Sequence, residues 1–153
     1  MKHTFLLEPG EWLGDGTVWD ADDTPLPAQA RAAVTHAPGR WFNRAVLRTE
    51  AEAPAELTTA YEIEPLRRDA LATSWRAYNP ALGTLLGRLV VYDAAMLSLF
   101  RSEDGRLTGS EALVYRNARR YLITGALFDG EVKRSAWQLE LKRRARRRRP
   151  PLD

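Results

Sequence analysis

Residues 56–64 read Glu-Leu-Thr-Thr-Ala-Tyr-Glu-Ile-Glu, and this stretch decides the fold class. Leu57, Thr59, Tyr61 and Ile63 occupy every second position, and the side chains between them are mostly charged or polar. Successive side chains of a β-strand point to opposite faces, so this alternation places one face in a core and the other in water. The stretch is therefore predicted to be a half-buried strand.

Similar segments recur along the chain and are separated by turn signals. Asp104-Gly105 and Asp129-Gly130 are dipeptides typical of tight hairpins. Further strands are predicted near residues 12–19, 28–35, 41–48, 85–101 (two strands or one long bent strand), 107–115, 121–128 and 132–141. An open meander leaves two unpaired edges, and closure into a barrel removes both. The sequence thus predicts an all-β fold: an antiparallel meander of about nine to ten strands closed into a barrel, with at most one short helix.

Residues 65–78 allow two interpretations. After Pro65, the apolar residues from Leu66 through Tyr78 fall near helical spacing, and proline is favoured in a first helical turn. Alternatively, Leu71, Thr73, Trp75 and Ala77 lie on one face of a strand. The strand is favoured because the segments on both sides read as one continuous meander.

The positive charge is concentrated at the C-terminal end of the chain. The net charge is +3, but residues 1–141 carry 16 basic and 19 acidic side chains, and residues 142–153 carry seven basic and one acidic. A barrel domain over residues 1–141 and a basic tail over residues 142–153, expected to be disordered, are therefore predicted. The tail's arginines would contact nucleic acid or anionic lipid, or serve only solubility. They are Arg143, Arg144, Arg146, Arg147, Arg148 and Arg149.

Residues suited to catalysis or metal binding are few. The absence of cysteine excludes disulfides and thiol nucleophiles. Neither His3 nor His36 has a partner at a spacing typical of a metal site or a catalytic pair, and both are predicted to be exposed. A haem-binding barrel needs a histidine from its wall, and the C-terminal strands have none. No cofactor, metal or catalytic residue is predicted, and enzymatic activity has no direct support.

The N-terminal residues do not resemble a secretion signal. Only three consecutive apolar residues, Phe5 to Leu7, precede Glu8 and Pro9, which is too short for the apolar region of a signal peptide. No apolar stretch approaches the roughly 18 residues that span a bilayer. A cytoplasmic protein without a transmembrane segment is expected.

Aromatic residues and one carboxylate indicate binding rather than chemistry. The chain has five tryptophans, and Trp19, Trp75 and Trp137 fall in or beside predicted strands. They fill the core or, together with Tyr61, line a ligand cavity. Glu111 lies just inside a predicted strand. If it points into the barrel, desolvation would raise its pKa and suit it to anchor a ligand.

Two short motifs resemble those of known barrel families. Gly10-Glu11-Trp12 resembles the Gly-x-Trp motif of lipocalins and other calycins. That resemblance implies that Trp12 plugs one end of the barrel under an arginine of the last strand, here Arg143. Arg119-Arg120-Tyr121 resembles the Arg-x-Tyr pair of intracellular fatty-acid-binding proteins, which implies that Arg119 and Tyr121 hold a ligand carboxylate.

The C-terminal half of the chain is similar to bacterial calycin-like proteins to which no activity is assigned. The similar segments are Asn79 to Gly83, Ser102 to Gly105, Gly109 to Glu111 and Ser135 to Trp137. The resulting hypothesis is non-catalytic binding of a small, largely apolar ligand inside a barrel. The alternative is an interaction module whose basic tail contacts nucleic acid or anionic lipid.

Overall fold

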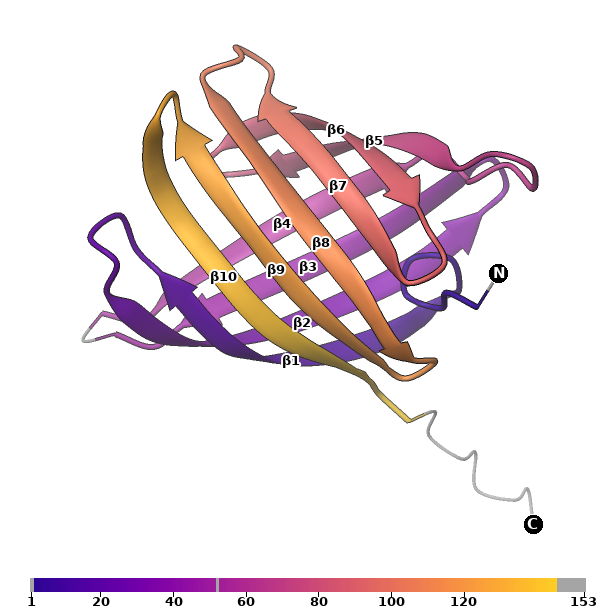
Figure 1. Cartoon of the computed structure of the whole chain (residues 1–153), viewed down its shortest axis with the longest axis horizontal. Helices are drawn as coiled ribbons and strands as arrows, with labels where there is room; N and C mark the ends of the chain where they lie inside the picture. The colour runs from indigo at the N-terminus through magenta and orange to yellow at the C-terminus, as the bar shows by residue number, and fades with distance from the viewer. Residues whose placement is uncertain (1, 52, 146–153) are drawn as a thin grey trace.

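The computed structural model describes residues 2–51 and 53–145, and these residues form a closed antiparallel barrel (Figure 1). Its ten strands are β1 (Gly10–Trp19), β2 (Pro25–Ala37), β3 (Arg40–Thr49), β4 (Ala55–Ile63), β5 (Ala72–Asn79), β6 (Gly83–Val91), β7 (Ala95–Ser102), β8 (Leu107–Asn117), β9 (Arg120–Asp129) and β10 (Val132–Arg143). The predicted fold class is confirmed. Each strand pairs with the next in sequence, and β1 pairs with β10 to close the sheet.

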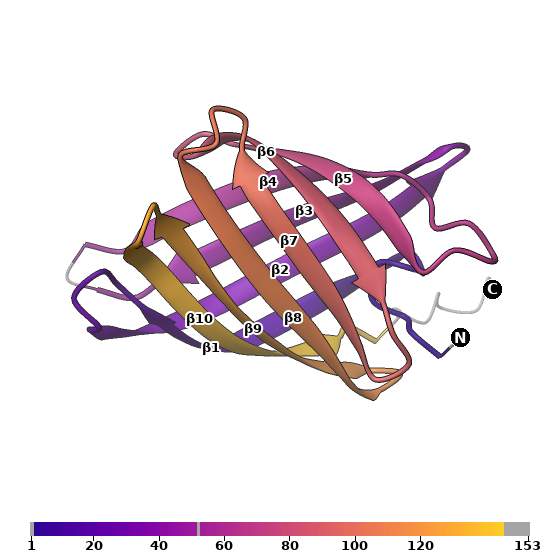
Figure 2. The same cartoon turned by 45° about the horizontal axis from the view of Figure 1, so that its top comes forward.

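Alternation along each strand separates the interior from the outer surface. On β4, Thr59 and Ile63 are buried, whereas Ala60 and Glu62, which lie between them in sequence, are exposed. Strands on one side of the barrel run at a steep angle to the strands on the opposite side (Figure 2). This tilt is a requirement of closing a twisted sheet.

The ambiguous segment 65–78 contains a strand. Residues 65–71 form an irregular connection, and β5 then pairs with β6 from Ala72 to Asn79. The strand interpretation is confirmed. Just before the strand, the carbonyl of Leu71 accepts the N–H of Val91 (2.7 Å). The stretch 85–101 forms two strands, β6 and β7, rather than one.

The N-terminal segment closes one end of the barrel (Figure 1). Phe5 and Leu6 are buried there beside Trp12, which is 0% exposed. The ring centroids of Phe5 and Trp12 are 5.2 Å apart, and those of Trp12 and Tyr121 are 5.6 Å apart, both in edge-to-face geometry. Edge-to-face contacts are favoured between aromatic rings, so these side chains form a compact aromatic plug.

The prediction that both histidines are exposed was wrong. His3 is 4% exposed; its Nε2 donates to the carbonyl of Tyr92, and its Nδ1 lies 2.9 Å from the Tyr121 hydroxyl. His36 is half-buried, stacks on Trp41 at 4.3 Å between ring centroids, and contacts the Leu6 carbonyl through Nε2 at 2.9 Å. Folding the N-terminal segment over the barrel end creates these contacts, which are remote in sequence.

Strand β10 continues two residues past the expected end of the barrel domain, to Arg143. Arg144 follows and lies 3.3 Å from a carboxylate oxygen of Glu11. The predicted polyanion-binding residues Arg146 to Arg149 lie outside the described residues. Within residues 2–51 and 53–145, no helix is long and apolar enough to cross a membrane.

We predict that Tyr121→Phe loosens the plug. The Tyr121 oxygen accepts the backbone N–H of Thr4 (3.0 Å) and meets the His3 ring, so its loss leaves buried polar groups unpaired, at a cost of about 1–3 kcal/mol. Urea unfolding measures this loss. Tyr78→Phe, at a tyrosine 58% exposed, is the control and should change stability by less than about 0.5 kcal/mol. Equal effects of the two variants would contradict the assignment.

Candidate functional site

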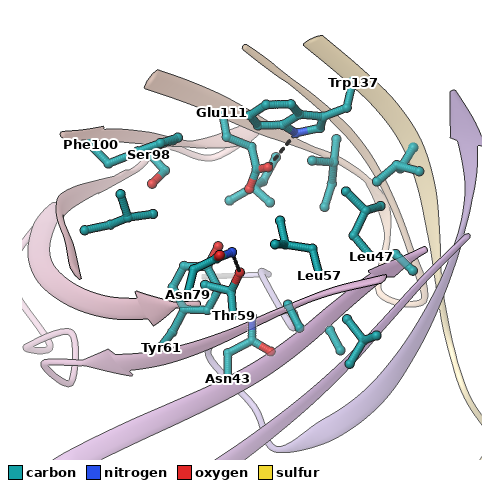
Figure 3. Close-up of a pocket in the computed structure, with 18 of the residues that line it drawn as sticks. Asn43, Leu47, Leu57, Thr59, Tyr61, Asn79, Ser98, Phe100, Glu111 and Trp137 are labelled. Carbon is teal, nitrogen blue, oxygen red and sulfur yellow. Dashed lines mark hydrogen bonds between the residues drawn. The ribbon is translucent and has the colours of Figure 1, made fainter. Parts of the chain in front are cut away.

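The barrel encloses a cavity of about 400 Å³ (Figure 3). It begins at the plug, where Phe5 and Leu6 form its floor, and extends toward the opposite end of the barrel, where Leu82 and Arg134 border it. Its other walls are mostly aliphatic or aromatic, and include Ala30, Ala32, Ala45, Leu47, Leu57, Leu85, Leu89, Leu113, Ile123 and Leu139.

Small side chains on one side of the barrel help to leave this space. The inward positions of β2 are Ala28, Ala30 and Ala32, followed by Val34. On the neighbouring β1, Gly14 also faces inward, and the Leu141 side chain occupies the space beside it, 2.8 Å from a Cβ atom built there. Because the alanine side chains are short, this side of the interior is not filled.

Trp137 and Glu111 are joined across an intervening strand. The Trp137 Nε1–H donates to Glu111 Oε2 at 2.7 Å, and Figure 3 shows the carboxylate reaching into the cavity. Between them on β9 is Gly125, which pairs with both residues. A Cβ atom at Gly125 would lie 2.5 Å from the Trp137 ring. The absence of a side chain at this position therefore allows the indole to lie across β9 and contact β8.

Trp75, on β5, is arranged in the same way, with its indole over a glycine of the neighbouring strand. It pairs with Gly87, where a Cβ atom would lie 2.0 Å from the indole. The indole crosses β6 and its Nε1–H donates to Ser98 Oγ on β7 at 3.0 Å. Ser98 in turn pairs with Glu111, so the two indole hydrogen bonds end on neighbouring strands at the same level of the barrel.

Burial dominates the electrostatics of Glu111. Desolvation raises its pKa to about 7, and the hydrogen bond from Trp137 offsets only part of this rise. The cations that border the cavity, Arg31 and Arg134, are both exposed. Tyr61 faces the same space; burial, and to a smaller extent the charge of Glu111, raises its pKa.

The wall opposite Glu111 carries a second polar group of residues (Figure 3). Asn79 donates from Nδ2 to Thr59 Oγ1 at 2.9 Å, and its Oδ1 accepts the backbone N–H groups of Ala81 and Leu82. These hydrogen bonds fix the turn between β5 and β6. Asn43 is also buried, and its Oδ1 has no partner among the described residues.

The structure brings four of the predicted ligand-binding residues together and leaves three apart. Tyr61, Trp75, Glu111 and Trp137 all line the cavity. The others lie elsewhere: Trp19 follows the inward-facing Val18 and points out of the barrel, Arg119 is exposed in the β8–β9 turn, and Tyr121 is in the plug. Arg119 and Tyr121 therefore do not form a carboxylate site inside the cavity.

Trp12 and Arg143, which the lipocalin resemblance implies as a closing pair, are adjacent in the β1–β10 register. The Arg143 guanidinium carbon lies 5.8 Å from the Trp12 ring centroid. Arg143 also donates to Glu8 Oε2 at 2.7 Å and to the Pro9 carbonyl at 2.9 Å. The guanidinium passes close to Gly10, where a Cβ atom would lie 3.2 Å from two of its nitrogens. The arginine thus ties the N-terminal segment to the last strand.

The sequence-based reasoning missed the glycines and the serine on which the aromatic arrangement depends. Gly87 and Gly125 occupy inward positions in the middle of strands, and glycine there often marks a close approach of another group. Phe100 likewise lies over Gly109 on β8, at 2.3 Å from a Cβ atom built there. Within the described part of the chain, no group of three or more His, Asp or Glu side chains is placed to hold a metal ion.

The fold of this chain is similar to that of a protein of known structure. No family model matches the sequence, and no curated protein matches it. Among solved structures, the chain is similar to the S-type phycobiliprotein lyase CpeS from Guillardia theta, with a TM-score of 0.65. The similarity covers 94% of this chain and 92% of that chain, at 8% sequence identity. At this identity, the similarity is one of fold.

The raised pKa of Glu111 predicts a specific dependence of stability on pH. In the unfolded chain the carboxyl ionises near 4.5, and in the folded chain near 7. Between these values the folded state binds more protons, so the free energy of unfolding falls as pH rises. Glu111→Gln removes this term. Its stability relative to the native protein should therefore rise by on the order of 3 kcal/mol from about pH 4.5 to about pH 8.

Urea unfolding across this range measures the difference. Glu140→Gln, at an exposed carboxylate on the outer face of β10, is the matched control and should show a nearly constant difference. A constant difference for Glu111→Gln as well would show that the carboxyl is not desolvated.

A second prediction concerns the glycine beneath Trp137. Gly125→Ala should displace the indole, break its hydrogen bond to Glu111 and cost about 1–3 kcal/mol. The same substitution should cost much less when Trp137 is already phenylalanine, because the ring atoms it would meet are absent. A double-mutant cycle in urea unfolding measures this coupling. Additive effects of the two substitutions would contradict a direct contact.

Proposed function

We propose that the protein binds a small, largely apolar molecule inside a calycin-like barrel, without catalysis. The observation that carries this proposal is the cavity: a mostly apolar space inside the barrel with one carboxyl group on its wall, that of Glu111, and the indole of Trp137 as the hydrogen-bond partner of this group. Its volume of about 400 Å³ falls in the range of about 300–1,000 Å³ typical of small-molecule sites.

The composition of the cavity wall suits a ligand that has a large apolar part and a small polar part. Alanine and leucine side chains surround most of the length of the cavity, and apolar surface of this kind favours a hydrocarbon or an aromatic ring over water. The polar groups are few, as in sites where a small number of hydrogen bonds orients an apolar ligand. Because a barrel of similar fold is a phycobiliprotein lyase, bilins belong among the molecules to be tested.

The proposal predicts that filling the cavity blocks binding. Ala45→Phe on β3 places a ring in the cavity, whereas Ala60→Phe on β4 places the same ring on the exposed outer face. The neutral dye N-phenyl-1-naphthylamine should bind the native protein with enhanced emission and with energy transfer from Trp75 and Trp137. We expect Ala45→Phe to reduce its affinity at least about tenfold, a change equivalent to about 1.4 kcal/mol.

Ala60→Phe should retain the native affinity for the dye. Native mass spectrometry of protein purified from cells provides a second measurement, since a retained ligand adds a defined mass. Dye affinity that is unchanged in folded Ala45→Phe, or absent from the native protein across a range of apolar probes, would overturn the proposal.

A further inference from the structure

The charge inside the cavity has one sign. Glu111 is the acidic residue that lines the wall, and the bordering cations, Arg31 and Arg134, are exposed to solvent. Arg134 lies 3.6 Å from the Asp129 carboxylate at the end of the barrel. Trp137 supplies one hydrogen bond to Oε2, and no hydrogen bond to Oε1 is formed by the described residues. An ionised Glu111 therefore has a free acceptor atom and no counter-charge beside it.

Aromatic rings gather on the level of this carboxylate. Tyr61 and Trp75 are in edge-to-face contact at 5.1 Å between ring centroids, and Phe100 lies 5.7 Å from Trp75. Trp137 completes the group from β10 and holds the carboxylate itself. Rings around a carboxylate form the environment in which proteins recognise organic ammonium ions, because ring faces and carboxylate both attract positive charge.

We propose, as a refinement that rests on the proposed function, that the ligand is an amphiphilic amine whose ammonium group binds Glu111 among these rings and whose apolar part lies along the alanine and leucine walls. An anionic ligand such as a fatty-acid carboxylate would be disfavoured in the same place. Its charge would oppose that of Glu111, and the arginine of the Arg119–Tyr121 motif is outside the cavity.

The ionisation state of Glu111 and its affinity for a charged ligand affect each other. The groups that face Glu111 from the strands around it are Ser98 on β7, Trp137 on β10 and Tyr61 on β4. None of them carries a positive charge, so an ammonium group would be the counter-ion that the cavity lacks. Binding it favours the ionised carboxylate and restores part of the solvation lost on burial. By linkage, amine affinity should rise with pH through the Glu111 pKa of about 7.

The experiment compares three ligands of equal chain length, decylamine, decanol and decanoate, as competitors of N-phenyl-1-naphthylamine below their micelle-forming concentrations. At about pH 8 we expect decylamine to bind at least about tenfold more tightly than decanoate. Lowering the pH to about 5.5 should weaken decylamine binding by at least about tenfold and change decanol binding little.

Glu111→Gln should remove the preference for the amine and leave decanol affinity within about twofold. Glutamine retains an acceptor for Trp137, so the variant is expected to fold. Glu62→Gln, at an exposed carboxylate on the outer face of β4, controls for general attraction of cations and should keep the preference.

The outcomes separate the refinement from the proposed function. Decanoate binding as tightly as decylamine, or an amine preference that survives Glu111→Gln, would overturn the refinement while decanol binding still supports an apolar ligand. Failure of the dye and all three ligands to bind the native protein would overturn both.

Discussion

Two indoles lie flat across neighbouring strands because those strands carry glycine at the crossing points, and the interior of the barrel depends on this arrangement. With any side chain at Gly87 or Gly125, Trp75 and Trp137 would have to turn into the space that is now the cavity. Because the two indoles pack against the barrel wall instead, their N–H groups donate hydrogen bonds to Ser98 and Glu111. Aromatic rings over inward-facing glycines also shield backbone that glycine would leave bare.

The same construction explains how a carboxyl group persists in an apolar barrel. An unpartnered buried carboxylate costs several kcal/mol, and proteins usually supply a cation or keep the group protonated. Here one indole N–H is the partner, and the pKa near 7 leaves the group divided between its two forms at neutral pH. Glu111 is therefore poised at neutral pH between a neutral hydrogen-bonding group and an anion.

The fold was readable from the sequence because it depends on local alternation, and the site was readable only in part. Inward positions of β4 and β8, including Tyr61 and Glu111, follow directly from the period of two. The partnership of Glu111 with Trp137 joins residues 26 positions apart in sequence, and its geometry depends on barrel closure. The exposure of His3 was predicted wrongly for the same reason, since its partners Tyr92 and Tyr121 are 89 and 118 positions away in sequence.

The plugged end and the centre of the barrel are packed differently. At the plugged end, Phe5, Trp12 and Tyr121 pack without space between them, and Arg143 fastens the N-terminal segment from outside. This packing anchors a barrel whose centre is left incompletely filled, where voids and a desolvated acid lower stability. Sites that violate the rules of core packing and polar satisfaction are where function is expected in a folded protein. In this barrel, Glu111 is a desolvated acid on the wall of an incompletely filled cavity.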